Sequence, residues 1–76
     1  MNEDYQVFSA RAVDTVYGAL DNIEVAKTAT MYAGTMFVTC NAYSADKIKT
    51  ALTDTMGCGV IVSRVGPEYS FDFVGA

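Results

Sequence analysis

The pattern of apolar and polar positions is easiest to interpret in the second half of the chain. Residues 34–42 are rich in β-branched and aromatic side chains, which predicts a strand. Met36, Val38 and Cys40 alternate onto one face of this strand, and Phe37 with its flanking threonines takes the other. The pattern therefore predicts a strand whose two faces differ in chemistry.

Residues 44–56 follow a helical pattern instead. Their apolar stripe, at intervals of three and four, consists of Ala45, Ile48, Leu52 and Met56. This spacing is typical of an amphipathic helix with one buried side. Ser44 is expected to cap the N-terminus of this helix. Gly57 is expected to end it in the left-handed conformation.

Residues 60–65 and 68–74 both have strand-like composition, and Gly66-Pro67 between them is a strong turn signal. These segments predict a hairpin. Its second strand places three alternating aromatic residues on one face: Tyr69, Phe71 and Phe73. We expect this aromatic face to point toward the core, with Ser70 and Asp72 pointing away.

The sequence leaves the register of this hairpin open. A two-residue turn at Pro67-Glu68 pairs Val62 with Phe73, whereas a three-residue loop over residues 66–68 pairs Ile61 with Phe73. Because a slip of one residue exchanges the two faces of a strand, Val62 and Ile61 are alternative neighbours of the aromatic residues.

The first half of the chain is less distinctive. Residues 9–22 predict a helix, with Ser9 as its N-cap and an apolar stripe formed by Ala12, Val13, Val16, Tyr17 and Leu20. Residues 4–8 fit either a short strand or an earlier start of this helix. Residues 23–30 fit either a strand that pairs with the 34–42 segment or a continuation of the helix.

Both halves show the same coarse order of strand, helix and strand. Two such units form the split βαβ arrangement of a ferredoxin-like domain, here with a C-terminal hairpin. The alternative is a helix–strand–helix–hairpin order without a repeat. In both cases the predicted fold class is α+β: a small antiparallel sheet of three to five strands with two helices on one face. We expect residues 1–76 to form a single domain. The apolar content of 51% favours a folded chain, and so short a chain can bury only one thin core.

Charge narrows the classes of partner. The first 25 residues hold five acidic side chains against Arg11 alone, so they account for the whole formal net charge of −4. The five cations of the chain are scattered, and we therefore predict no direct nucleic-acid binding.

No apolar run approaches the roughly 18–20 residues of a membrane span, and the N-terminus lacks the pattern of a signal peptide. We accordingly expect a cytoplasmic protein without a membrane partner.

The chain contains no histidine, which removes the commonest general base and most zinc sites. We predict no enzymatic activity, no metal and no cofactor. Cys40 and Cys58 are interpreted as small buried residues, although both lie at predicted strands and their proximity across the sheet is left open. The Gly57-Cys58-Gly59 triplet runs from a helix into a strand, the reverse of a phosphate-binding loop.

The remaining candidates for function are acidic and aromatic surface residues. The candidate partner-binding residues are Asp14, Asp21, Glu24, Tyr5, Tyr32 and Tyr43. Tyrosine is favoured at interfaces because it combines a large contact area with a polar tip. We therefore predict a small acidic protein-interaction module, of the phage or mobile-element type, that binds and inhibits a host protein through this surface or an exposed strand edge. The alternatives are a homodimeric or larger assembly protein, and a mimic of DNA charge that occupies a basic nucleic-acid-binding site.

Overall fold

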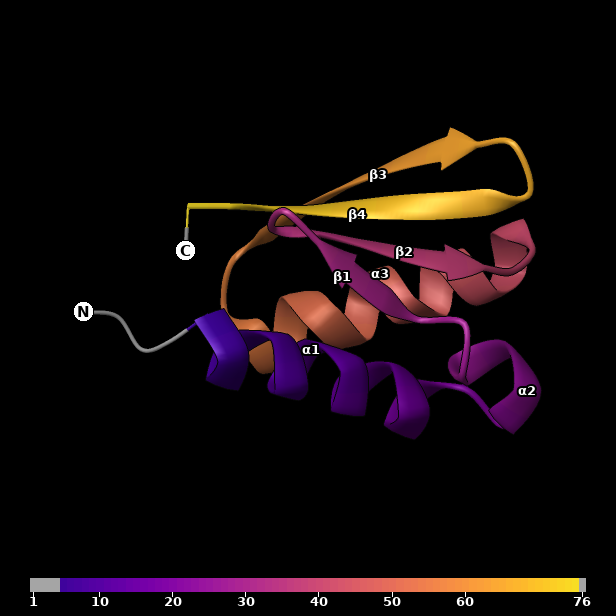
Figure 1. Ribbon diagram of the computed structural model, residues 1–76, viewed down its shortest axis with the longest axis horizontal. Coiled ribbons are helices and arrows are strands. Elements are labelled where there is room, and N and C mark those ends of the chain that lie inside the picture. The colour runs from indigo at the N-terminus through magenta and orange to yellow at the C-terminus, as the bar shows by residue number, and fades with distance from the viewer. Residues whose placement is uncertain (1–4, 76) are drawn as a thin grey trace.

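Helices lie on one side of a twisted antiparallel sheet in the computed structural model, which describes residues 5–75 (Figure 1). In chain order the elements are α1 (Tyr5–Ala19), α2 (Ile23–Ala26), β1 (Thr30–Tyr32), β2 (Thr35–Thr39), α3 (Ala42–Met56), β3 (Gly59–Val65) and β4 (Glu68–Val74). The two long helices α1 and α3 contact each other, and α3 also contacts β3. The predicted α+β class, with an antiparallel sheet and two helices on one face, is confirmed.

The four strands are ordered β1-β2-β4-β3, and every neighbouring pair is antiparallel. Two hairpins, β1–β2 and β3–β4, are therefore joined through the pairing of β2 with β4. This order places β3 at one edge of the sheet and the short β1 at the other.

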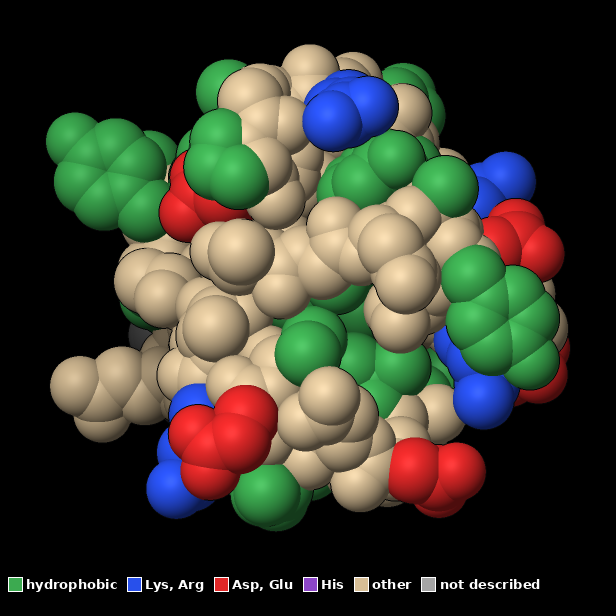
Figure 2. Space-filling view, turned by 90° about the vertical axis from the view of Figure 1, so that its right-hand side faces the viewer, with side chains coloured by type: hydrophobic (Ala, Val, Ile, Leu, Met, Phe, Trp, Pro, Cys, Tyr) green, Lys and Arg blue, Asp and Glu red, His purple; other side chains and the backbone are tan. Residues whose placement is uncertain are grey.

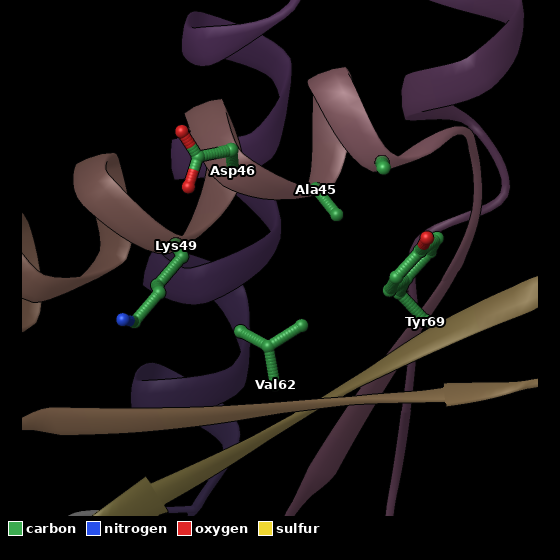
Figure 3. Close-up of a pocket in the computed structure, with 6 residues that line it drawn as sticks. Ala45, Asp46, Lys49, Val62 and Tyr69 are labelled. Atoms are coloured by element: carbon green, nitrogen blue, oxygen red, sulfur yellow. The ribbon is translucent and has the colours of Figure 1, made fainter.

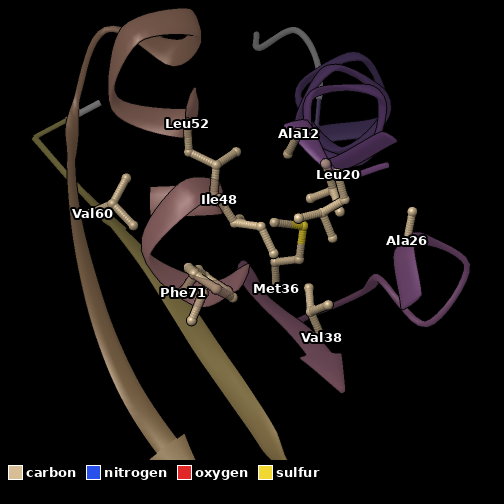
Figure 4. Packing of buried hydrophobic residues seen from close by; sticks show 11 residues of the cluster. Ala12, Leu20, Ala26, Met36, Val38, Ile48, Leu52, Val60 and Phe71 are labelled. Carbon is tan, nitrogen blue, oxygen red and sulfur yellow. The ribbon is translucent and has the colours of Figure 1, made fainter. Parts of the chain in front are cut away.

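The core fills the space between the helices and the sheet (Figure 4). Its fully buried residues include Ala12, Val16, Met36, Val38, Ile48, Leu52 and Phe71. The stripes predicted for both helices are confirmed in the main, since Ala45 and Leu20 are also buried and Met56 packs against the cluster. Tyr17 is an exception: 39% of it is exposed, so its place in the core was wrongly predicted. It lies one position beyond Val16, on the solvent side of α1.

The predicted cap of α3 is wrong. The helix begins at Ala42, and the side chain of Asn41 accepts a hydrogen bond from the backbone N–H of Ser44 at 2.8 Å. Ser44 is thus the third helical residue, whose N–H needs a partner, rather than the residue that supplies one. The predicted end of α3 is confirmed: Gly57 has the left-handed φ of +70°, and its N–H donates to the carbonyl of Thr53.

Both predicted registers of the β3–β4 hairpin are wrong. The turn consists of Gly66 and Pro67, so Val62 pairs with Phe71 and Val60 with Phe73. Gly66 has φ +63° at the first central position, which is the arrangement of a type II′ turn and matches the twist of the flanking strands. The aromatic face is confirmed: Phe71 is buried, and its two aromatic neighbours on β4 pack against the core.

The structure decides between strand and helix for the two segments that the sequence left open in the first half of the chain. Of residues 4–8, the first lies outside the described residues and the other four begin α1, and the segment at 23–30 divides into the short α2 and the start of β1. Ser9 lies inside α1 and is not its cap, contrary to the prediction. A ferredoxin-like arrangement is not confirmed, because the first βαβ unit needs a strand where residues 5–8 are helical.

Candidate interaction surface

The tyrosines proposed for partner binding lie at the surface but at different places. Tyr5 sits beside the β1–β2 turn, where its hydroxyl accepts a hydrogen bond from the N–H of Gly34 at 3.1 Å. Tyr32 ends β1 and is 72% exposed. Tyr43 lies in the first turn of α3, with the Lys47 ammonium 5.3 Å from its ring centroid. Tyr5 and Tyr32 are therefore grouped at one turn, and Tyr43 belongs to a separate site.

The acidic candidates are exposed but form no common surface with Tyr5 and Tyr32. Asp14 lies within α1, Asp21 follows that helix, and Glu24 lies in α2 at the end of α1 remote from Tyr5. Glu24 is also paired with Lys27, whose nitrogen lies 3.7 Å from its carboxylate. Figure 2 views the molecule from the right-hand side of Figure 1, where acidic and basic side chains are dispersed around the rim.

The sheet face that points away from the helices carries an unexpected set of apolar residues. The exposed members are Tyr32, Ile61, Val65 and Val74. The strand registers align Tyr32, Thr35, Asp72 and Ile61 in one row across the four strands. We call this surface the open sheet face. Its existence follows from a sheet with helices on one side only. The sequence pattern places Ser70 and Asp72 there, but it leaves the side of Ile61 open because the hairpin register is open.

Polar side chains on the open sheet face make hydrogen bonds within the sheet. The hydroxyl of Thr35 donates to the carboxylate of Asp72, and the hydroxyl of Ser70 donates to the carbonyl of Ser63 at 3.5 Å. Ser70 is buried by its neighbours on the adjoining strands although it faces away from the helices. Phe37 on the inner strand β2 is half-buried beside Ser70 on this face. The exposed apolar side chains lie toward its margins, with Ile61 and Val65 along the edge strand β3.

The outer edge of β3 has backbone groups available for pairing. In a type II′ turn the carbonyl of Val65 accepts the N–H of Glu68, which makes this pair the first hydrogen-bonded pair of the hairpin. Bonded and non-bonded pairs alternate along an antiparallel ladder. The N–H and C=O groups of Val60, Val62 and Arg64 therefore point outward, away from β4.

A cavity of about 140 Å³ lies beneath this edge, between β3, β4 and α3 (Figure 3). It is lined by Ala42, Ala45, Asp46, Lys49, Val62 and Tyr69. The side chains of Val62 and Ala45 point toward each other from the strand and the helix. We call the outer edge of β3 together with this cavity the edge groove.

Two cations belong to the edge groove. Lys49 lines the cavity together with Asp46, and Arg64 lies on β3 with its Nε donating to the carbonyl of Gly66 at 3.1 Å. Within residues 5–75 the ion pair found is Glu24–Lys27, so neither groove cation is paired with a carboxylate there. The chain has five cations in all. Two of them thus lie at one groove of a molecule with net negative charge.

The two cysteines are not neighbours, which decides the question that the sequence leaves open. Cys40 follows β2 near the Glu68 end of β4, whereas Cys58 precedes β3 near the Val74 end. The intervening length of β4 spans about 20 Å, and both thiols are free. Burial raises the pKa of the Cys40 thiol, which disfavours the reactive thiolate.

The described part of the chain contains no group of three or more histidine, cysteine, aspartate or glutamate side chains placed to hold a metal ion. Among the same residues, no helix is long and apolar enough to cross a membrane. No family model, no curated protein and no solved structure shows a significant match to the chain.

Proposed function

We propose that this protein is a non-enzymatic interaction module that binds a protein partner along β3. The observation that supports the proposal is the seven-residue edge strand, whose outer N–H and C=O groups have no strand partner among residues 5–75 and lie beside a largely apolar cavity. Natural proteins usually shorten, charge or cover such an edge, because it is a template for another strand. The other edge of this sheet, β1, is only three residues long.

The narrower role is modulation of the partner. A module with this size and a net charge of −4 fits a phage- or mobile-element-type protein that occupies a functional surface of a cytoplasmic host protein and inhibits it. Inhibition by occupancy needs no catalytic group, only a surface that remains accessible in the folded chain.

Edge pairing is tested by replacing Val62 with proline. Val62→Pro removes an outward-pointing N–H, and proline is tolerated on the solvent side of an edge strand. Val62→Ala is the matched control, because it shortens the same side chain and keeps the N–H. A host protein captured by the wild-type chain and by Val62→Ala, but not by a folded Val62→Pro, supports the proposal. Equal capture by all three contradicts it.

Charge reversal tests the surface predicted from the sequence. Asp14, Asp21 and Glu24 are replaced together by lysine, with circular dichroism to check that the chain remains folded. If partner binding follows β3, capture is retained by this triple variant. Loss of capture in the triple variant together with normal capture by Val62→Pro assigns the partner to the acidic residues instead.

Self-assembly is the second candidate function, and the open sheet face favours it. Ile61, Val65 and Val74 are exposed apolar residues, and such side chains are buried when two copies associate. Light scattering across a dilution series measures the mass directly. An assembly that persists on dilution and dissociates in the Ile61→Glu variant would support this function. A monomer at every concentration excludes it.

A further inference from the structure

We infer that the edge groove takes an extended peptide segment of the partner, which pairs antiparallel with β3, places one apolar side chain in the cavity and one acidic side chain beside Arg64. This inference rests on the proposed function, because it names the ligand of the same edge. It specifies three separate contacts, one with the backbone, one with the cavity and one with a charge.

The backbone contact comes from the alternation along β3. Val60, Val62 and Arg64 direct their N–H and C=O groups outward, so an added strand pairs with these residues. The same three residues have their side chains on the helix side of the sheet, since Val60 belongs to the core and Val62 lines the cavity. A peptide residue directly opposite Val62 therefore also turns its side chain toward α3.

The cavity contact limits the size of that peptide side chain. The cavity has a volume of about 140 Å³. A cavity of roughly 150 Å³ in another protein accommodates a benzene molecule. Its walls include the methyl groups of Ala42, Ala45 and Val62 and the ring of Tyr69. A single leucine, isoleucine or phenylalanine side chain matches this volume and chemistry.

The charge contact fixes a second peptide position. Arg64 lies two residues after Val62, so the peptide residue opposite Arg64 has its side chain on the same face as the one entering the cavity. Lys49 adds a second positive charge at the cavity, while Asp46 is the carboxylate that lines it. Arg64 and Lys49 together outweigh the one negative charge of Asp46, so an acidic side chain opposite Arg64 meets a net positive charge.

Antiparallel direction orders these two positions along the peptide. Because the peptide runs against β3, the residue opposite Arg64 comes first and the residue opposite Val62 comes two positions later. The expected pattern is acidic–any–apolar, read from the N-terminus. The middle residue faces the open sheet face beside Ser63.

The probe is a blocked, fluorescein-labelled peptide with the sequence Ser-Thr-Ser-Glu-Thr-Leu-Ser-Thr-Ser. Its binding to the full chain is measured by fluorescence anisotropy. Replacement of its leucine by serine is expected to weaken binding about tenfold or more, because the cavity loses its apolar occupant. Replacement of its glutamate by lysine is expected to weaken binding about fivefold.

Two pairs of protein variants locate the contacts. Ala42→Leu fills the cavity from an exposed helix position and should abolish the preference for leucine, whereas Thr50→Leu on another side of α3 should not. Arg64→Glu should reverse the charge preference, so that the lysine peptide binds better than the glutamate peptide. Lys47→Glu makes the same change of charge outside the cavity lining and should leave the preference unchanged.

Amide hydrogen exchange separates strand addition from binding in the groove alone. The bound peptide should slow exchange at the amides of Val60, Val62 and Arg64, while Ile61 and Ser63 already pair with β4 and should change little. The inference is overturned if the glutamate–leucine peptide binds no better than its serine-substituted form, or if Arg64→Glu fails to exchange the charge preference.

Failure of this inference is distinguishable from failure of the proposed function. Suppose that Val62→Pro no longer captures the host protein but the chain shows no preference among the peptides. Binding along β3 is then supported, and the acidic–any–apolar ligand is rejected. Capture that is indifferent to Val62→Pro rejects binding along β3 itself.

Discussion

Ile48 and Ile61 are both isoleucines, but one is buried and the other is exposed. Replacing each with alanine tests which face of the sheet the folded chain covers. Ile48 on α3 is fully buried between the helices and the sheet, whereas 56% of Ile61 on β3 is exposed on the open sheet face. The substitution removes the same atoms in both cases. Any difference in the free energy of unfolding therefore reports the surroundings of the side chain.

The expected magnitudes are well separated. Truncation of a fully buried isoleucine to alanine costs about 2–5 kcal/mol, because apolar contacts are lost and a cavity remains. Truncation of an exposed side chain usually changes stability by less than about 0.5 kcal/mol. A domain of 76 residues has a stability of roughly 4–11 kcal/mol. Ile48→Ala therefore removes a large part of it, and at about 4–8 °C per kcal/mol the melting temperature falls by at least about 8 °C.

Urea and thermal unfolding followed by far-ultraviolet circular dichroism measure both variants. Each curve is recorded at two protein concentrations, because an oligomer has a melting temperature that depends on concentration. Ile61→Ala should behave like the wild type at low concentration. If it destabilises the chain as much as Ile48→Ala, independently of concentration, Ile61 is covered within a single chain and the argument for an open sheet face fails.

Three further predictions concern local features. Asn41→Ala should lower the free energy of unfolding by about 1 kcal/mol in a urea titration, and Ser44→Ala should cost less; the reverse order would restore Ser44 as the cap. Gly57→Ala should cost about 1 kcal/mol in the same assay because alanine is strained at φ +70°, and an unchanged midpoint would contradict this. The raised pKa of Cys40 reduces the fraction of its thiol that is ionised. In the Cys58→Ala variant, iodoacetamide should therefore alkylate Cys40 more slowly near pH 8.5 than it alkylates a cysteine in a short peptide, and the rate should rise at higher pH. Equal rates for Cys40 and the peptide cysteine would contradict the raised pKa.

The sequence predicts the second half of the fold well because its signals there are local. Alternation over β2 and the three-to-four spacing over α3 each depend on neighbouring residues alone. The cap of α3 is harder to predict, since Asn41 and Ser44 are both good capping residues and lie only one turn apart. Which of them caps depends on where the chain leaves β2.

The start of α1 depends on a distant contact. Residues 5–8 include Tyr5, Val7 and Phe8, a composition that suits a strand equally well. In the fold, the ring of Phe8 meets that of Phe73 edge-on, with centroids 4.9 Å apart. This contact joins the first helix to the last strand, and no local pattern predicts it.

The candidate interaction site is less predictable than the fold for the same reason. An exposed strand edge could be anticipated in general terms, but the identity of that edge requires the order β1-β2-β4-β3. This order depends on the pairing of β2 with β4, whose paired residues are at least 29 positions apart along the chain (Thr39 with Glu68, 68 − 39 = 29). The cavity under β3 combines side chains of α3 with those of both strands of the second hairpin, so it too exists only in the folded chain.

The single charge on β3 distinguishes the partners that this edge can accept. The strand contains neither proline nor lysine, two devices that commonly keep edges from pairing, and its one ionised side chain is Arg64. A second copy that paired with its Arg64 opposite this one would bring two unpaired cations together, and an apolar strand would leave the guanidinium without a counterion. An acidic residue at that position gives the guanidinium a counterion, which neither a second copy nor an apolar strand supplies. Arg64 therefore limits self-pairing and selects an acidic strand by the same electrostatic interaction.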